Sequence, residues 1–268
     1  MGVINNQDWQ NLREKFLNAT PFPSICIDNF LSPEFALEVS RSYPKFSNAL
    51  GQGLEFSTVN EKQKVQITES EKFPDPVKKL YQALAGEKFI HSMQALSGID
   101  ELSFDDHFAG GGMHITNTSG ILDVHIDFNF SKNLQLYRRL NILIYLNEEW
   151  LEDWGGKIEL WDKKIKKCIH GYSPVLNRCL IFATSDYSFH GVTAVNAPPG
   201  IERKSFAIYL YNKGPSENVD GEYHSTVFKA RPNEKFKKFC QMPAEAGVKK
   251  MKDTFHSGKQ LVKKIIGK

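Results

Sequence analysis

The sequence predicts a mainly β fold with flanking helices. From about Phe104 onward, short apolar or alternating segments are separated by turn residues, a pattern typical of an all-β sandwich or barrel. The first hundred residues carry helix start signals instead. The length of 268 residues suits one large domain or a core with extensions. We therefore expect an N-terminal mixed helical support region packed on the core, a β core and a basic helical extension, at residues 1–103, 104–228 and 229–268.

The N-terminal region is predicted to begin with a short strand at residues 24–28, which Pro21-Phe22-Pro23 introduces. Ser32-Pro33-Glu34 then has the residues of a helix start, namely a capping Ser, Pro at the first position and an acid in the first turn. Two further helical patterns begin at Asp75 and Glu87. We expect these helices to end near residues 85 and 96.

The clearest strand of the predicted core covers residues 121–129, where apolar and polar residues alternate. Successive side chains of a strand point to opposite faces. One face should therefore carry Leu122, Val124, Ile126 and Phe128, and the other Asp123, His125, Asp127 and Asn129. Four more strands are predicted at residues 140–146, 157–161, 178–183 and 204–212.

The net charge of +3 conceals a basic C-terminal extension. Residues 229–268 contain 12 Lys and Arg against 3 Asp and Glu, a balance of +9, so residues 1–228 sum to −6. Val248, Met251, Phe255, Val262 and Ile265 recur at helical spacing, which predicts a basic amphipathic helix. This helix either packs on the body, which we favour, or contacts an anionic surface such as a membrane. Nucleic-acid binding is not expected, because no nucleic-acid motif accompanies the tail.

Several classes of protein are excluded by missing motifs. The four cysteines form no CxxC pair, which argues against a zinc ribbon or a thioredoxin-type site and favours reduced thiols. Gly110-Gly111-Gly112 lacks the residues of a phosphate-binding loop. The N-terminus does not resemble a signal peptide, and no segment approaches the roughly 20 apolar residues of a membrane span. We therefore expect a cytoplasmic protein.

His125 and Asp127 form the strongest candidate for a metal site. Residues i and i+2 of a strand point the same way, so an imidazole and a carboxylate can bind one cation from one strand. Two His and one carboxylate on one face of a metal are typical of non-haem iron(II) oxygenases. A buried strand histidine without a metal is the alternative for His125 taken alone. His107, His114 and His170 lack metal-ligand spacing, and we interpret them as structural.

Further residues along the chain strengthen the metal interpretation. His190 follows the strand predicted at residues 178–183, and Arg203 and Ser205 share one face of the last strand. A guanidinium and a hydroxyl there suit a ligand carboxylate. Arg203 alone could equally be a solvated charge at a strand end.

The order of these features resembles the iron(II)/2-oxoglutarate-dependent dioxygenase superfamily, in particular its prolyl-4-hydroxylase-like branch. Residues 125–129 are similar to the iron-binding strand of that branch, and residues 144–156 to its Tyr-Leu-Asn…Trp…Gly-Gly segment. His190-Gly191-Val192 is similar to its distal histidine segment. The resemblance covers about residues 104–212 and implies a double-stranded β-helix (jelly roll) core.

The resemblance also implies roles for individual residues. His125, Asp127 and His190 would be the catalytic iron ligands. Arg203, Ser205 and Tyr145 would bind the distal carboxylate of 2-oxoglutarate, and Asn141 would also contact this co-substrate. Lys204 would point to the other face. The implied cofactors are Fe(II), 2-oxoglutarate and O2, with ascorbate as a candidate reductant.

The implied reaction is the hydroxylation of an unactivated C–H bond with decarboxylation of 2-oxoglutarate to succinate. Asp127 favours hydroxylation over chlorination, because related halogenases lack the carboxylate ligand; desaturation and cyclisation stay open. The substrate is a small molecule, an amino acid or a peptidyl residue. Arg138-Arg139 could form an anion-binding mouth or a solvated strand start, and the segment 223–226 could cap the core or reach the substrate.

Two other function classes compete with the active oxygenase. A catalytically inactive double-stranded β-helix protein would bind a ligand without turnover. Such relatives usually lose a metal ligand or the basic residue that binds the co-substrate. This chain keeps all four residues, namely His125, Asp127, His190 and Arg203. A cupin-like domain with another metal would normally use more histidines in a different spacing. We therefore favour the enzyme.

Overall fold

The computed structural model describes residues 2–214 and 223–243 of the chain. The chain divides into one compact unit of residues 1–228 and a second of residues 229–268. The first unit contains helices α1 to α5 and, except for Lys229 at the end of β13, the described sheet. The apolar residues predicted to form the amphipathic tail helix lie at 248–265, outside the described residues.

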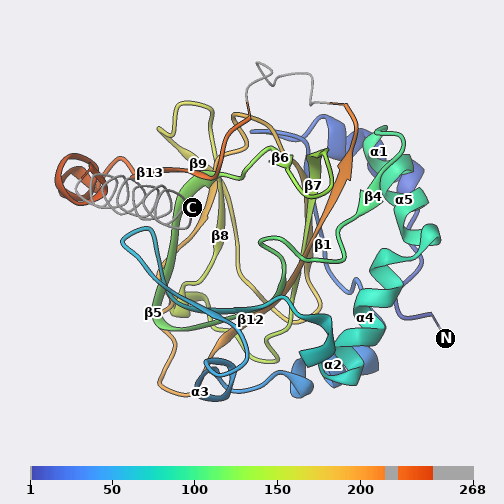
Figure 1. Cartoon of the computed structure of the whole chain (residues 1–268), viewed down its shortest axis with the longest axis horizontal. Coiled ribbons are helices and arrows are strands. Elements are labelled where there is room, and N and C mark those ends of the chain that lie inside the picture. Colours follow the sequence, from blue (N-terminus) through green and yellow to red (C-terminus); the bar gives the residue numbers. More distant parts are fainter. Residues whose placement is uncertain (1, 215–222, 244–268) are drawn as a thin grey trace, which may run out of the picture. The chain divides into compact units, whose positions relative to one another are not determined.

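Five α-helices come from the first hundred residues: α1, α2, α4 and α5 lie on one side of the strands, and the short α3 lies apart from them (Figure 1). Pro33 begins one of them after Ser32, as predicted, although the Ser32 side chain makes no capping hydrogen bond. Their bounds are α1 Trp9–Leu17, α2 Pro33–Ser42, α3 Phe46–Ala49, α4 Asp75–Ala85 and α5 Glu87–Ser97, with single 3-10 turns η1 at Ser70–Lys72 and η2 at Glu152–Trp154.

The strands form one large curled antiparallel sheet of 13 strands in the order β1-β10-β7-β12-β5-β11-β8-β9, with the short β2, β3, β4, β6 and β13 pairing alongside. This is the mainly β, jelly-roll architecture that the sequence predicted. The strands are β1 Ser24–Ile27, β2 Leu54–Ser57, β3 Glu61–Ile67, β4 Ser103–Phe104, β5 Gly112–Ile126, β6 Phe130–Ser131, β7 Leu136–Tyr145, β8 Ile158–Trp161, β9 Cys168–Tyr172, β10 Cys179–Ala183, β11 His190–Val192, β12 Arg203–Asn212 and β13 Val227–Lys229.

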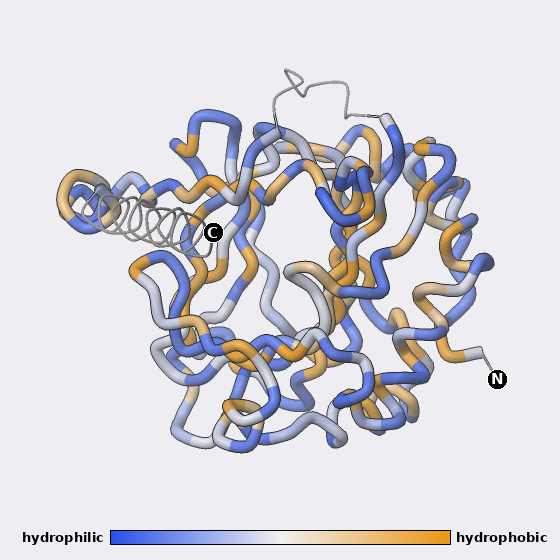
Figure 2. Tube along the Cα trace, viewed as in Figure 1, coloured by the Kyte–Doolittle hydropathy of each residue, from blue (hydrophilic) through white to orange (hydrophobic). Residues whose placement is uncertain are grey.

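Alternation along the central strands separates the core from the site. In β7, Ile142 and Ile144 pack into the main hydrophobic core with helix residues, while Asn141, Leu143 and Tyr145 line a cavity on the other side. In β12, Phe206 and Ile208 likewise belong to that core, whereas Arg203, Ser205 and Tyr209 face the cavity. Figure 2 shows the hydrophobic stretches along these strands and along the helices that cover them.

Some strand boundaries differ from the sequence prediction. β5 begins at Gly112 because its first half pairs with β12 and β3, which alternation within residues 121–129 does not reveal. β7 begins at Leu136 rather than at residue 140, since β6 pairs with its first residues. Besides β1, which was predicted, the N-terminal region contributes β2, β3 and the start of β4, and β3 pairs with β5.

The second unit contains a short π-helical segment, η3, at Lys237–Gln241. Across the described part of the chain, no helix combines the length and the apolar character needed to cross a membrane.

Candidate metal centre and co-substrate site

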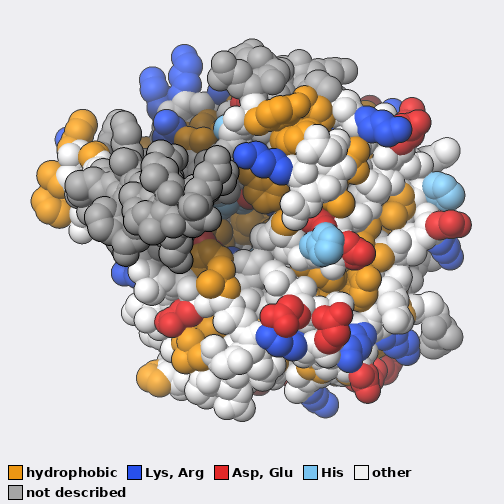
Figure 3. All heavy atoms as spheres, viewed as in Figure 1, with side chains coloured by type: hydrophobic (Ala, Val, Ile, Leu, Met, Phe, Trp, Pro, Cys, Tyr) orange, Lys and Arg blue, Asp and Glu red, His pale blue; other side chains and the backbone are white. Residues whose placement is uncertain are grey.

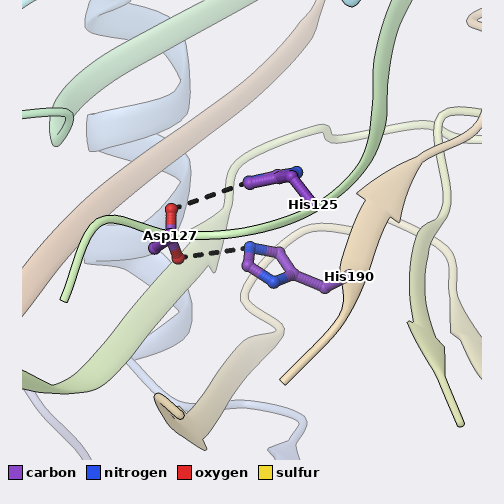
Figure 4. A group of neighbouring side chains, drawn as sticks. All are labelled: His125, Asp127 and His190. Atoms are coloured by element: carbon purple, nitrogen blue, oxygen red, sulfur yellow. Dashed lines mark ion pairs between the residues drawn. The ribbon is translucent and has the colours of Figure 1, made fainter. Parts of the chain in front are cut away.

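Three side chains predicted as metal ligands meet at one point inside the curled sheet (Figure 4). β5 carries His125, Asp127 follows its end, and β11 begins with His190, which pairs with His125 across the two strands. His125 Nε2 lies 3.6 Å from Asp127 Oδ1, and His190 Nε2 lies 3.4 Å from Asp127 Oδ2. One ligand atom from each residue lies within 4.8 Å of the others.

Backbone carbonyls orient both imidazoles. His125 Nδ1 lies 2.8 Å from the Asp123 carbonyl oxygen, and His190 Nδ1 lies 2.9 Å from that of Ser188. Because a carbonyl oxygen only accepts hydrogen bonds, each Nδ1 carries the proton. The lone pair of each Nε2 is then free for a metal, the arrangement usual for metal-binding histidines.

The ionisation of the group also suits a cation. Burial by itself raises the pKa of Asp127, but the charge of Arg138, together with His190 and His125, outweighs it and holds that pKa well below its usual value. Burial, and then the neighbouring His125, lowers the pKa of His190 to about 4. At neutral pH Asp127 is therefore ionised and His190 is neutral, the forms that bind metals.

Arg138 is a component of the site that the sequence did not identify. Its Nη2 lies 3.2 Å from Asp127 Oδ2, and its side chain is buried. The guanidinium carbon lies 3.3 Å from the centroid of the Tyr209 ring and 4.9 Å from that of Phe128. The interpretation of this arginine as a solvated strand start is wrong, because β7 begins earlier and carries Arg138 inward beside Asp127. An anion-binding role stays a prediction.

Asn141 connects these two charged residues. Its amide nitrogen donates to Asp127 Oδ2 at 2.8 Å, and its amide oxygen accepts from Arg138 Nε at 2.8 Å. Asn141 lines the cavity, but its contacts are with the Asp127 carboxylate and Arg138. The structure thus gives it the position of a residue that orients a metal ligand.

The residues predicted to bind 2-oxoglutarate line the same cavity as the triad, which has a volume of about 300 Å³. Figure 3 shows the viewed face hollowed near its centre. Arg203 is buried, and no acidic side chain among the described residues pairs with it. Tyr145 is fully buried, and its hydroxyl makes no hydrogen bond of normal geometry within the described residues, although the neighbouring Arg203 interacts with it. Burial raises the pKa of Tyr145, so the hydroxyl remains a donor.

The Arg203 guanidinium and the Tyr145 hydroxyl fit a carboxylate. A buried guanidinium without an acidic partner, next to a buried hydroxyl, is costly unless a ligand supplies the missing acceptor. Burial also lowers the pKa of Arg203, which reflects this cost. Lys204 lies on the other side of β12, where its Nζ donates to the Ser40 carbonyl oxygen at 3.1 Å, as alternation predicted.

The segment between β7 and β8 supports Arg203. Asn147 Oδ1 accepts from the Lys204 backbone N–H at 2.7 Å, which ties this segment to β12. Gly155 and Gly156 both have φ of +63°, a conformation that favours glycine. The Gly156 carbonyl oxygen accepts from Arg203 Nε at 2.7 Å. The Tyr-Leu-Asn and Gly-Gly residues singled out in the sequence therefore hold the guanidinium in place.

The predicted assignment of faces is wrong at Leu122 and Phe128, which line the cavity together with His125. His190 pairs with His125 but Val192 pairs with Leu122, so Gly191 alone faces two residues of β5. Such a bulge changes the direction of the side chains on one side of it. Phe128 lies beyond the end of β5, where strand alternation no longer applies.

His114, interpreted from sequence as structural, also lines the cavity. It pairs with Ser205 on one side and Gln66 on the other, and its Nε2 has no hydrogen-bond partner among the described residues. Burial, assisted by the charges of Lys64 and Arg203, keeps its pKa well below the usual value. No sequence signal marks it, since these neighbours come from distant strands.

The segment that follows residues 215–222 reaches the site. Thr226 and Phe228 line the cavity, and the Phe228 ring lies 5.4 Å from that of His125. Tyr223 stacks on Phe130 with centroids 4.1 Å apart, and the His224 backbone N–H donates to Asn129 Oδ1 at 3.0 Å. Thr226 of the segment 223–226 therefore lines the cavity, whereas Tyr223 and His224 contact residues just after β5.

Comparison with known proteins agrees with this chemistry. Residues 111–211 match the family model of the 2OG-Fe(II) oxygenase superfamily. The matched segment includes the triad, Tyr145, Arg203 and Ser205. No curated protein sequence matches the chain.

Solved prolyl hydroxylases share the fold. A prolyl hydroxylase from Trichoplax adhaerens, in complex with a hypoxia inducible factor peptide fragment, is 18% identical with a TM-score of 0.53, over 78% of this chain and 95% of that one. A Pseudomonas putida prolyl-4-hydroxylase is 16% identical with a TM-score of 0.53, over 77% of this chain and all (100%) of that one. A Phytophthora capsici prolyl 4-hydroxylase is 20% identical with a TM-score of 0.52, over 82% of this chain and 70% of that one.

The sequence resemblance, the jelly-roll fold and the family match converge. The cofactors of this family are Fe(II) and 2-oxoglutarate, and the described donors fit both. Residues 111–211 form a domain of the 2OG-Fe(II) oxygenase superfamily, and the chain is a 2-oxoglutarate-dependent dioxygenase that shares its fold with solved prolyl hydroxylases.

Proposed function

We propose that His125, Asp127 and His190 bind the Fe(II), and that Arg203, with Ser205 and Tyr145, binds the distal carboxylate of 2-oxoglutarate. The observation that carries this assignment is that the three donors and the buried, acid-free guanidinium line one cavity. When bound, the metal and the co-substrate would supply, with O2 as oxidant, an oxidative decarboxylation in which one oxygen atom enters succinate and the other the substrate, with release of carbon dioxide.

The chain's own residues orient and enclose these reactants. The Asp123 and Ser188 carbonyls fix the two imidazoles, and Arg138 with Asn141 fixes the carboxylate. Phe182 and Phe228 pack against the histidine rings, with centroids 4.8 Å from His190 and 5.4 Å from His125, and exclude water there. A dry site strengthens the attraction between Arg203 and a carboxylate.

The reaction we propose is hydroxylation of a small molecule, an amino acid or a peptidyl residue. The retained carboxylate at Asp127 supports hydroxylation over halogenation. The inactive ligand-binding alternative is not favoured, since the triad and Arg203 are all present and close together. Our division into a support region, a core and a basic extension, and the cytoplasmic location, remain proposals from the sequence.

The variant Asp127→Ala tests this function. It removes the carboxylate donor, and we expect succinate formation from 2-oxoglutarate to fall to the background rate while the circular dichroism spectrum is unchanged. Asp106→Ala, at a side chain that is 73% exposed, is the matched control and should keep the wild-type rate. Wild-type succinate formation by Asp127→Ala would show that Asp127 is not a ligand.

A further inference from the structure

A second charged feature of the cavity lies apart from the triad and Arg203. Lys64 Nζ and Glu61 Oε1 form an ion pair at 2.8 Å, and each side chain is only 11% exposed. Both residues belong to β3 and line the cavity. Removing two charges from water is costly, so a buried ion pair is weak support for stability. Its position in a reaction cavity therefore calls for a functional explanation.

The backbone of β3 is shaped to place both charges on the cavity side. Residues i and i+3 of a regular strand point to opposite faces. Here Gln63 adopts φ of +54°, and the register with β5 shifts between Lys62 and Lys64. A left-handed conformation is unfavourable for a residue other than glycine and tends to persist where function requires it. The shift turns Glu61 and Lys64 to the same face.

The ion pair lies beside the positions expected for the metal and the co-substrate. Lys64 and Arg203 both pair with Thr116, from opposite sides of β5. Glu61 and Val192 likewise both pair with Leu122. Neighbouring strands are about 4.8 Å apart, so β3 is on the order of 10 Å from the strands of Arg203 and His190. Because Arg203 serves the co-substrate, the ion pair is left to serve the other substrate.

The Glu61–Lys64 ion pair suits a ligand that has both a positively and a negatively charged group. A simple anion or a simple cation would engage one partner and leave the other buried without a counter-charge. An α-amino acid offers an ammonium and a carboxylate one carbon apart, which match an adjacent anion and cation. The Lys64 ammonium also lies 5.1 Å from the Phe56 ring centroid, so the binding point has an apolar wall.

We propose that Glu61 and Lys64 bind the α-ammonium and α-carboxylate groups of a free amino acid, which is the substrate of this oxygenase. The proposal rests on the proposed function of the triad and Arg203. On binding, Glu61 exchanges Lys64 for the ammonium, and Lys64 exchanges Glu61 for the carboxylate. The side chain of the amino acid then extends toward the triad.

Anaerobic titration calorimetry on the full chain loaded with Fe(II) and 2-oxoglutarate tests this proposal. The probes are the proteinogenic amino acids, their N-acetyl and carboxamide derivatives, and peptides with both ends blocked. We expect at least one free amino acid to bind, and its blocked derivatives to bind at least about tenfold more weakly. The same amino acid should stimulate succinate release in air.

A charge exchange separates substrate binding from a structural role. The double variant Glu61→Lys/Lys64→Glu keeps an ion pair but inverts its direction, so we expect amino-acid binding to weaken at least about tenfold while 2-oxoglutarate binding stays within about twofold. The matched control is Glu69→Lys/Lys72→Glu, an exposed pair with the same i,i+3 spacing, which should behave as wild type.

The outcomes distinguish the two proposals. If the protein binds Fe(II) and 2-oxoglutarate but no free amino acid, or if the exchanged pair binds the amino acid as well as wild type does, the assignment of Glu61 and Lys64 is wrong and the proposed function stands. Binding of blocked peptides in preference to free amino acids also overturns it. If the protein binds no 2-oxoglutarate, the proposed function fails, and this proposal fails with it.

Discussion

At the scale of single residues, the site depends on how its ligands are held. Burial by itself would disfavour the ionised form of Asp127, because it raises the pKa of this carboxyl group. The positive charge of Arg138 reverses this effect, and its guanidinium packs on the rings of Tyr209 and Phe128. Substitution of a residue that holds a metal ligand typically lowers metal affinity by about tenfold to a hundredfold.

The variant Arg138→Met should therefore weaken Fe(II) binding by about tenfold to a hundredfold, because Asp127 loses its main counter-charge. Anaerobic calorimetric titration with Fe(II) measures the change. Arg41→Met, which removes an exposed partner of Glu148, should leave Fe(II) affinity unchanged. Native Fe(II) affinity in Arg138→Met would show that Arg138 does not hold the ligand.

At the scale of elements, the strands predicted from alternation and turn residues include β5, which carries His125, and β12, which begins with Arg203. The short β11, which begins with His190, was not predicted. The sequence could not reveal the bulge opposite Gly191, which turns Leu122 into the cavity, because it arises from pairing between β5 and β11. For the same reason the sequence did not predict β3, whose polar residues Glu61 and Lys64 reach the cavity only because β3 pairs with β5. Local patterns predict strands, whereas register depends on distant partners.

The two glycines before β8 provide a test at this scale. A Cβ on Gly156 would lie 3.0 Å from Trp150 Cζ2 and 3.1 Å from Arg203 Cδ, so Gly156→Ala should displace the guanidinium. We expect its dissociation constant for 2-oxoglutarate to rise at least about tenfold, since small displacements at a binding site are costly.

Gly200→Ala is the matched control, because Gly200 also has a positive φ of +87° but a Cβ there would meet nothing within 4 Å. Both variants share the backbone cost of a left-handed alanine. Equal 2-oxoglutarate affinity in the two variants would contradict the supporting role of Gly156.

At the scale of the whole molecule, the curled sheet buries ionisable groups that the unfolded chain exposes. His190 and His114 are neutral in the fold because burial depresses their pKa values. Below the ordinary histidine pKa of about 6.5, these two imidazoles bind protons in the unfolded chain but stay neutral in the folded chain. The stability contributed by these neutral histidines is complete above about pH 6.5 and is lost as the pH falls toward the folded-state values.

For His190, whose folded pKa is about 4, the free energy of unfolding of the metal-free protein should fall by about 3 kcal/mol between pH 6.5 and 4. Urea unfolding across this range measures it. The free energy of unfolding of His190→Gln should depend less on pH than that of wild type. His107→Gln, at a side chain that is 72% exposed, should keep the wild-type pH dependence. Identical slopes for His190→Gln and wild type would contradict the depressed pKa.

The central claim, that one cavity binds Fe(II) and 2-oxoglutarate together, is tested most directly by visible absorption. Fe(II) and 2-oxoglutarate are added to the full chain without oxygen, beside His190→Ala. We predict a charge-transfer band of the chelated 2-oxo acid in wild type that is absent in the variant. A well-folded wild-type protein without this band, or an equal band in His190→Ala, would contradict the account.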